Sequence, residues 1–182
     1  MGEANSPTAV LLLLAAFSRY CEALAWARQR ACETWGPVAL ESPVFEFTHT
    51  DYYQAAMGPG LRKVFFALAR LIDPGELAEI KRLTNAWEGE YAAVAGRPEP
   101  RPLNLDPGYL TPGKLVLAST KDHAHRIYLG RGIYAEVTLY YKHHAWRSSE
   151  WTFADYRQET YHCFFSTCRE YLRRRLREDQ TS

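Results

Sequence analysis

The stretch that decides the fold is VLLLLAAF, the uninterrupted apolar run from Val10 to Phe17. A short apolar run of this kind is typical of a strand that is buried on both faces. A secretory signal peptide would have basic residues before the run, but the only charged side chain there is Glu3. The run is also too short to cross a bilayer, which takes about 20 residues in a helix. We therefore expect a central strand in a cytoplasmic protein.

The residues after this run predict a helix and two more strands. Ser18 can cap the helix, and Gly36-Pro37 ends it. Residues Val44 to Phe47 and Arg62 to Ile72 place apolar side chains at alternate positions, as strands do. The apolar stripe of the helix consists of Tyr20, Leu24, Ala27, Ala31 and Trp35.

A second helix begins at Asp73-Pro74-Gly75-Glu76. Asp73 is suited to the N-cap, Pro74 to the first helical position, and Glu76 completes a capping box. We expect this helix to end at Gly96. Its apolar stripe consists of Leu77, Ile80, Leu83, Trp87 and Tyr91.

The second half of the chain predicts a turn, a short helix, a hairpin and a long final helix. Asp106-Pro107-Gly108 has turn composition, and Thr111-Pro112 resembles a helix start. Thr152 and Asp155 have the spacing of a capping box for the final helix. The expected ranges are Leu103 to Leu105 for a short extended piece, Gly113 to Thr120 for the short helix, His125 to Leu129 and Ile133 to Tyr141 for the hairpin strands, and Thr152 to Glu178 for the last helix.

The order strand, helix, strand, strand, helix, strand is that of a ferredoxin-like α+β sandwich. The hairpin and the long terminal helix then extend this βαββαβ core. No linker is long enough to divide the chain, so we expect residues 1–182 to form a single α+β domain.

Composition excludes some classes of function. The net charge of +1 argues against a protein that binds polyanions along a broad basic surface, so any nucleic-acid contact must come from a local patch. The cysteines have neither CxxC nor zinc-finger spacing, and we expect them to be reduced thiols in helices, as in a reducing compartment. They are Cys21, Cys32, Cys163 and Cys168.

Five segments occur here in an order that resembles a known family. They are Leu40 to Pro43, Thr50 to Gly60, Leu71 to Pro74, Asn104 to Tyr109, and Lys121 to Gly130. On these residues the chain resembles the prokaryotic domain-of-unknown-function family 4416. The resemblance implies a small cytoplasmic prokaryotic protein without a settled activity. Members often carry a GTP-binding label, but this sequence has no G-x-x-x-x-G-K-[ST] loop to hold phosphates. A nucleophilic triad is likewise unsupported, because no G-x-S-x-G occurs.

The hairpin carries the densest set of polar residues. A three-residue loop, Gly130-Arg131-Gly132, would pair Leu129 with Ile133 and Ile127 with Ala135. One face would then be apolar, with Ile127, Leu129, Ile133, Ala135, Val137 and Leu139. On the other face Arg126 would lie across from Glu136 and Tyr128 across from Tyr134. This face is either an anion- and base-binding surface, with Arg126 as donor and the tyrosines as stacking rings, or a structural ion pair beside an aromatic pair.

Other polar groups invite a functional and a structural interpretation. His123 and His125 share a strand face, and Asp122 and Asp106 could approach them, but only two ligands are fixed by local spacing, so we predict no metal site. Asp106 could be an acid–base group, or its side chain could bond its own turn. We expect His143-His144 to lie at the surface and Asp51-Tyr52-Tyr53 to lie in a loop. We expect a solvated tail at the run Arg173 to Arg175 with Arg177.

Together these residues favour a binding protein for a small phosphate-bearing ligand, a nucleotide or an RNA end, with hydrolysis left open. Asp106 and His125 are the acid–base candidates, and no motif identifies a cofactor. The alternative is a non-catalytic interaction or dimerisation module that uses the aromatic hairpin face. The candidate ligand-binding residues are Lys114, Lys121, Arg126, Tyr128, Tyr134, Glu136 and Tyr109.

Overall fold

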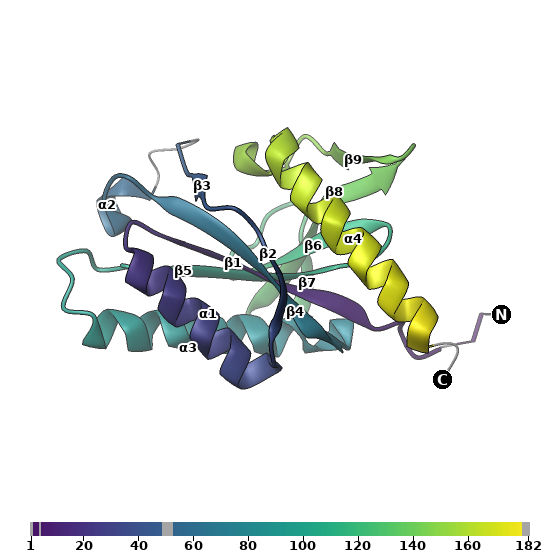
Figure 1. Ribbon diagram of the computed structural model, residues 1–182, viewed down its shortest axis with the longest axis horizontal. Helices are drawn as coiled ribbons and strands as arrows, with labels where there is room; N and C mark the ends of the chain where they lie inside the picture. The colour runs from purple at the N-terminus through teal and green to yellow at the C-terminus, as the bar shows by residue number, and fades with distance from the viewer. Residues whose placement is uncertain (1, 4, 49–52, 180–182) are drawn as a thin grey trace.

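A large antiparallel sheet organises the molecule (Figure 1). The computed structural model describes residues 2–3, 5–48 and 53–179, and within them the sheet has nine strands. The order is β2-β4-β1-β5-β6-β8-β7, with β3 paired to β4 and β9 to β8. The strands are β1 (Val10–Ser18), β2 (Val38–Glu41), β3 (Phe45–Glu46), β4 (Arg62–Ile72), β5 (Asn104–Leu110), β6 (Lys114–Ser119), β7 (Ile127–Gly130), β8 (Ile133–Lys142) and β9 (Ala145–Ser148).

Helices cover both faces of the sheet at β1 and β4. α1 and α3 lie on one face, and α4 crosses the other diagonally (Figure 1). In the part of the chain that is described, no helix combines the length and the apolar character needed to cross a membrane. The helices are α1 (Cys21–Trp35), α2 (Gln54–Met57), α3 (Leu77–Val94) and α4 (Glu159–Asp179), with short 3₁₀ turns η1 (Pro74–Glu76) and η2 (Ala154–Arg157).

The apolar run forms the central strand, as the sequence predicts. Every residue of β1 is buried, and β1 pairs with β4 on one side and β5 on the other. Its even-numbered side chains, such as Leu12 and Leu14, pack with α1 and α3. Its odd-numbered side chains, such as Leu11 and Leu13, pack with α4. A strand between two helical layers needs apolar side chains on both faces, which explains why the run has no polar interruption.

The first half of the chain agrees closely with the sequence prediction. β4 has the predicted bounds, and Asp73 and Glu76 form the capping box. The predicted stripe of α1 is buried from Leu24 to Trp35, whereas Tyr20 precedes the helix and is half-buried. Ser18, however, does not cap α1. It ends β1, where its hydroxyl donates to the Pro102 carbonyl and accepts from the Tyr20 N–H. Strand β2 was not predicted, because its side chains are only partly buried and show no clear alternation.

The Asp106-Pro107-Gly108 turn and the short helix after it are wrong predictions. Asp106 to Gly108 lie inside β5, and β6 replaces the helix. The Thr111 hydroxyl accepts from the N–H groups of Gly113 and Lys114, so it stabilises a tight β-turn and not a helix start. A side chain at position 108 would lie 2.3 Å from the Val116 carbonyl oxygen, so glycine allows β5 and β6 to approach here.

The hairpin keeps the predicted register over most of its length. Ile127 pairs with Ala135 and Tyr128 with Tyr134. The tip differs, because Gly130 pairs with Ile133, so a two-residue turn with a bulge replaces the three-residue loop. The turn residues Arg131 and Gly132 both have positive φ, as such hairpin turns require.

The predicted apolar face of this hairpin is not continuous. Ile133, Ala135 and Leu139 are buried, whereas Ile127, Leu129 and Val137 are exposed. A bulge at Thr138 in β8 turns Leu139 to the α4 face, and β7 is the last strand of the sheet, so its apolar side chains have little cover.

The chain ends differently from the prediction in one further respect. Thr152 and Asp155 do not form a capping box, because α4 begins only at Glu159. The Thr152 hydroxyl donates instead to the Thr138 carbonyl, and Asp155 pairs with Lys63. His143 and His144, both exposed, form the turn between β8 and β9 with φ values of 52° and 61°. Cysteines 21, 32, 163 and 168 are free thiols in helices.

Candidate functional site

The candidate site is a cavity of about 460 Å³ where β5 and β6 separate. These strands pair only from Gly108 to Leu110 and from Leu115 to Leu117. Pro107 has no N–H to continue the ladder, and the two remaining ends diverge. The lining consists of Phe17, Phe47, Tyr53, Lys63, Lys81, Asn85, Arg101, Asn104, Asp106, Leu117 to Lys121, His123, Arg126, Glu136 and Phe153 to Tyr156.

Lys81 and Asp106 form the floor of the cavity. The Lys81 Nζ donates to the Leu105 carbonyl at 2.8 Å and to Asp106 Oδ1 at 3.1 Å, and the Asn104 amide donates to Asp106 Oδ2. Burial raises the pKa of Asp106, but the charges of Lys81 and Lys63 and the hydrogen bonds from Lys81 and Asn104 outweigh it, so the net shift is downward. A carboxylate with a lowered pKa is a weak proton acceptor and a strong electrostatic partner.

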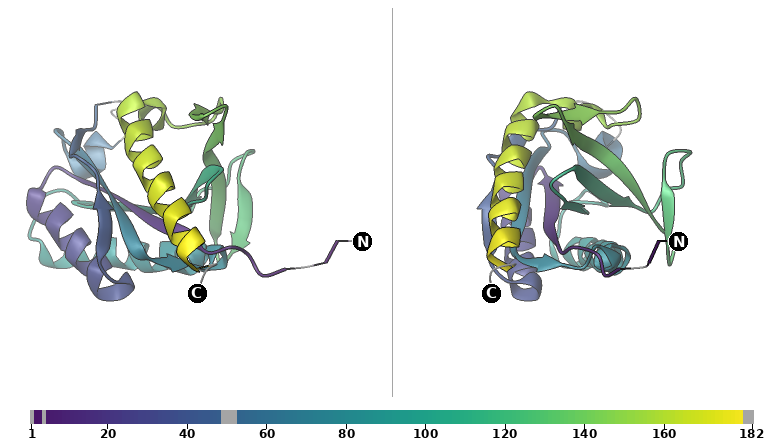
Figure 2. Two further views of the ribbon diagram at one scale, coloured as in Figure 1. Left: turned by 45° about the vertical axis from the view of Figure 1, so that its right-hand side comes forward. Right: turned by 90° about the vertical axis from the view of Figure 1, so that its right-hand side faces the viewer.

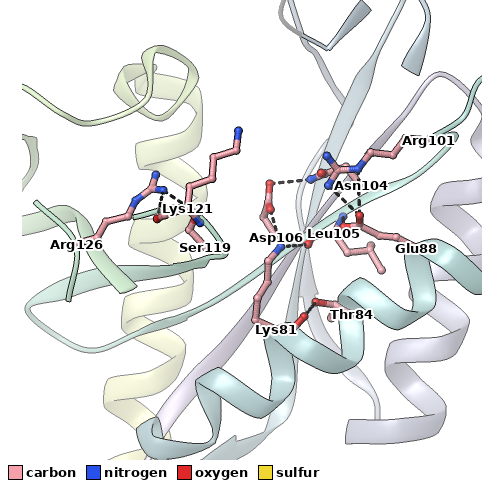
Figure 3. A network of polar contacts seen from close by, with 10 residues as sticks. All are labelled: Lys81, Thr84, Glu88, Arg101, Asn104, Leu105, Asp106, Ser119, Lys121 and Arg126. Carbon is pink, nitrogen blue, oxygen red and sulfur yellow. Dashed lines mark hydrogen bonds and ion pairs between the residues drawn. The ribbon is translucent and has the colours of Figure 1, made fainter. Parts of the chain in front are cut away.

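Arg101 enters the cavity wall opposite Arg126 (Figure 3). Glu88 Oε2 accepts hydrogen bonds from Nε and Nη2 of Arg101, and its Oε1 accepts from the Leu105 N–H. Burial raises the pKa of Glu88, and the charges of Lys81 and Arg101 oppose that rise. One edge of the Arg101 guanidinium is therefore held by Glu88. In the described part of the chain its Nη1 makes no hydrogen bond.

Lys63 and Asp155 make a buried ion pair at the α4 side of the cavity. The Lys63 Nζ lies 2.6 Å from Asp155 Oδ2, and both side chains are almost wholly excluded from solvent. Five aromatic rings lie within 6.0 Å of the ammonium group. Aromatic faces attract a cation, so these rings and Asp155 together surround the buried ammonium group with favourable contacts. The rings belong to Phe17, Phe47, Phe65, Tyr156 and Tyr161.

Arg126 and Glu136 make the third ion pair of the cavity wall. Arg126 Nε donates to Glu136 Oε2 at 2.8 Å, and Nη1 donates to the Ser119 hydroxyl and the Lys121 carbonyl. The side chains are 4% and 1% exposed. His125 Nε2 lies 3.0 Å from the same oxygen of Glu136, and Thr138 donates to Oε1. Residues 125 and 126 therefore both reach Glu136.

One buried hydroxyl at the cavity has no partner. The Tyr156 side chain lines the cavity and is 2% exposed, and within the described residues its hydroxyl makes no hydrogen bond. Burial raises the pKa of Tyr156 well above its ordinary value, and the negative charge of Asp155 adds to the effect. The group is therefore a neutral O–H that is shut off from solvent within the wall.

The structure brings together some of the residues that the sequence nominates. Asp106, Lys121, Arg126 and Glu136 line the cavity, and His125 contacts Glu136 from behind. In Figure 3, Lys121 and Arg126 lie on one side and Asp106 on the other.

Besides His125, four nominated residues lie outside this described lining. Lys114 is exposed at the far end of β6, and Tyr109 packs on the α3 face of the sheet. Tyr128 and Tyr134 contact each other on the hairpin, with ring centroids 5.2 Å apart.

Sequence reasoning missed Lys63, Lys81, Arg101 and Asp155. Two of them carried a signal, because Lys63 shares a strand face with Phe65, and Lys81 lies one turn after Leu77 on the buried stripe of α3. A lysine at an apolar position is rarely buried without a partner. Arg101 and Asp155 carried no such signal, since both lie in irregular segments or short turns.

The loop at Asp51 to Tyr53 and the metal prediction have different outcomes. Asp51 and Tyr52 lie outside the described residues, whereas Tyr53 lines the cavity. Among the described residues, no group of three or more His, Cys, Asp or Glu side chains could hold a metal ion.

Comparison with known proteins identifies a family. No curated protein and no solved structure matches the chain. The model of a family described as "domain of unknown function (DUF4416)" matches residues 8–171, which include all nine strands and every described residue that lines the cavity. The chain therefore belongs to the DUF4416 family.

Proposed function

We propose that this protein binds a small phosphate-bearing ligand, a nucleotide or an RNA end, in the cavity between β5 and β6. The observation that carries the proposal is the set of cationic side chains in the wall. Among the described residues that line the cavity, five are Lys or Arg. Two of them, Arg101 and Arg126, are guanidinium groups that a carboxylate holds at one edge. Guanidinium groups held in this way are suited to the planar, bidentate recognition of phosphate.

The two arginines are better suited to bind a phosphate group than a ligand that carries its charge on a single atom. Glu136 holds one edge of the Arg126 guanidinium, and Glu88 holds one edge of Arg101. Arg126 Nη2, like Arg101 Nη1, makes no hydrogen bond within the described residues. A planar guanidinium with a fixed orientation and a free N–H matches the oxygens of a phosphate group.

The remaining wall suits a ring-bearing molecule. Aromatic residues contribute from four separate segments of the chain. The volume of about 460 Å³ lies in the range of about 300–1,000 Å³ that small-molecule sites have. The aromatic lining residues are Phe17, Phe47, Tyr53, Phe153 and Tyr156.

Hydrolysis remains a proposal within this site. The lowered pKa of Asp106 favours an electrostatic role for that carboxylate. His125, the other acid–base candidate, contacts Glu136 but lies outside the described lining, so the cavity supports binding better than hydrolysis.

A thermal-shift screen followed by calorimetric titration tests the proposal. We expect at least one nucleotide, or a short 5′- or 3′-phosphorylated oligonucleotide, to raise the melting temperature of the wild type. Lys121→Ala should weaken its binding about tenfold or more, because a lining ammonium group is lost. Lys142→Ala is the matched control, an exposed lysine outside the described lining. The proposal is wrong if no phosphate compound shifts the wild type, or if both variants weaken binding equally.

A second candidate function is an interaction module, and one observation favours it. β7 is an edge strand, and its apolar side chains Ile127, Tyr128 and Leu129 are 72%, 58% and 43% exposed. Proteins usually protect such an edge with charge or cover. Docking of a second copy or another protein would bury it.

We also infer a ferredoxin-like core and a cytoplasmic location. The order β2-β4-β1-β5, all antiparallel, with α1 and α3 on one face, supports the βαββαβ core, to which the other strands and α4 are additions. The four free thiols support a reducing compartment.

A further inference from the structure

The mouth of the cavity carries an ordered pile of rings. His123, His125 and Trp151 stack with centroid distances of 5.9 Å and 5.5 Å and interplanar angles of 6° and 12°. Offset parallel packing at these distances is attractive for aromatic rings. His123, at one end, lines the cavity, and Trp151, at the other end, is 40% exposed. Both ends of the pile are therefore exposed, and His123 connects it to the cavity wall.

The loop that presents Trp151 is firmly held. The Thr152 hydroxyl accepts from the Ser149 N–H and donates to the Thr138 carbonyl at 2.7 Å. Arg157 donates to three carbonyl oxygens of the same loop, those of Ser149, Glu150 and Thr152. A large exposed ring on a loop with this many hydrogen bonds is pre-organised for contact, because little conformational freedom is lost on binding.

A second exposed ring lies between the stacked rings and the cationic side chains of the cavity. Phe153 follows the same loop, lines the cavity and is 42% exposed. The guanidinium carbon of Arg126 lies 5.9 Å from the centre of its ring. A phosphate at Arg126 and a base on these rings would therefore be neighbours.

We propose that the ligand is the phosphorylated end of a single nucleic-acid strand, with the terminal phosphate in the cavity and the following bases stacked on the rings at its mouth. This inference rests on the proposed function. A free mononucleotide would fill the cavity and leave Trp151 in water, whereas a strand end uses both. Base–aromatic stacking together with backbone contacts is how proteins bind single strands without reading sequence. The net charge of +1 fits an end and not a long strand, since a long strand needs a basic path along the surface.

Binding of four probes to the full chain tests this assignment. They are adenosine 5′-monophosphate, a 5′-phosphorylated adenosine trinucleotide, the 3′-phosphorylated trinucleotide, and the trinucleotide without terminal phosphate, in RNA and DNA forms. We expect one phosphorylated trinucleotide to bind at least about tenfold more tightly than both the monophosphate and the unphosphorylated trinucleotide, the contribution of about one stacked base.

Variants assign the extra affinity to the rings. Trp151→Ala should remove the advantage of the trinucleotide and leave the affinity for the monophosphate unchanged. Phe153→Leu, which keeps an apolar side chain but removes the ring, should do the same in part. Tyr140→Ala, an exposed aromatic outside the described lining, is the matched control and should change neither affinity.

The outcomes separate this inference from the proposed function. Equal affinity for the monophosphate and the phosphorylated trinucleotide, or equal losses for both in Trp151→Ala, would overturn the strand-end assignment and leave phosphate binding intact. Failure of all phosphorylated probes to bind the wild type would overturn both proposals.

Discussion

The cavity wall and the β7–β8 hairpin depart from ordinary packing in opposite directions. The cavity buries charges, Lys63, Lys81 and Arg126 among them. The hairpin, whose strand β7 lies at the edge of the sheet (Figure 2), exposes the apolar side chains of Ile127 and Leu129. Most proteins do the reverse. The buried charges each have a carboxylate partner and further hydrogen bonds, so the cavity is built as a polar site within the fold. Among the described residues, no comparable set of contacts offsets the cost of exposing these apolar side chains to water. The hairpin is therefore suited to contact with another molecule.

The largest expected effect comes from breaking the buried pair of Lys63 and Asp155. Asp155→Asn should lower the free energy of unfolding by about 3–5 kcal/mol, because it leaves a buried ammonium group without its counter-ion. Lys63→Met combined with Asp155→Leu should recover most of that loss, since well-packed apolar residues replace such pairs at little cost. Urea denaturation followed by circular dichroism measures both. A loss below about 1 kcal/mol in Asp155→Asn would mean that water reaches this pair and that the cavity wall is not dry.

Removal of Arg126 should have a smaller effect. Arg126→Ala deletes three hydrogen bonds, to Glu136, the Ser119 hydroxyl and the Lys121 carbonyl, and we expect the free energy of unfolding to fall by about 2–3 kcal/mol. The loss is smaller than for Asp155 because His125 and Thr138 stay in contact with the Glu136 carboxylate. Arg126→Ala combined with Glu136→Gln should be more stable than Arg126→Ala alone. If the double variant is less stable instead, Glu136 does not depend on Arg126 for its charge.

Asp106 should give a pH-dependent effect of about 1–3 kcal/mol at pH 7. Its folded pKa is lowered below the ordinary 3.8, so its stabilising effect is complete above that value and is lost as the pH falls through the folded pKa. Asp106→Asn should therefore be less stable than the wild type at pH 7, and the difference should shrink below about pH 4. Urea midpoints from pH 2.5 to 8 measure this. A difference that is constant over the whole range would assign the effect to packing and not to charge.

The sequence predicts the first half of the fold better than the cavity. The pattern of apolar residues identified β1, β4, α1 and α3, because each of these elements packs apolar side chains into the core on one face or on both faces. It failed at Asp106-Pro107-Gly108, where turn residues serve a strand. Pro107 lies where β5 leaves β6, and Gly108 lies where a Cβ would meet the Val116 carbonyl oxygen. Turn composition and strand separation use the same residue types, so local patterns do not distinguish them.

The partners in the two other ion pairs of the cavity could not be matched from the sequence, for a different reason. Lys63 meets Asp155 across 92 positions of the chain, and Lys81 meets Asp106 across 25. Such contacts depend on the order of strands in the sheet, which a single sequence does not fix. Arg126 and Glu136 were found because a hairpin joins them, so that local register determines their contact.

The smallest expected effect on stability comes from the hairpin, and it also tests the second candidate function. Ile127→Lys should change the free energy of unfolding by no more than about 0.5 kcal/mol, because the side chain is 72% exposed. Ligand affinity should not change, since Ile127 lies outside the described lining.

We expect the wild type to self-associate weakly in sedimentation velocity at high concentration, and Ile127→Lys to abolish this, because a charge on an edge strand opposes pairing with another edge. Lys121→Ala, which alters the cavity, should self-associate as the wild type does. A wild type that stays monomeric throughout would argue against docking of a second copy, and a large loss of stability in Ile127→Lys would mean that the hairpin is covered and the contrast with the cavity is false.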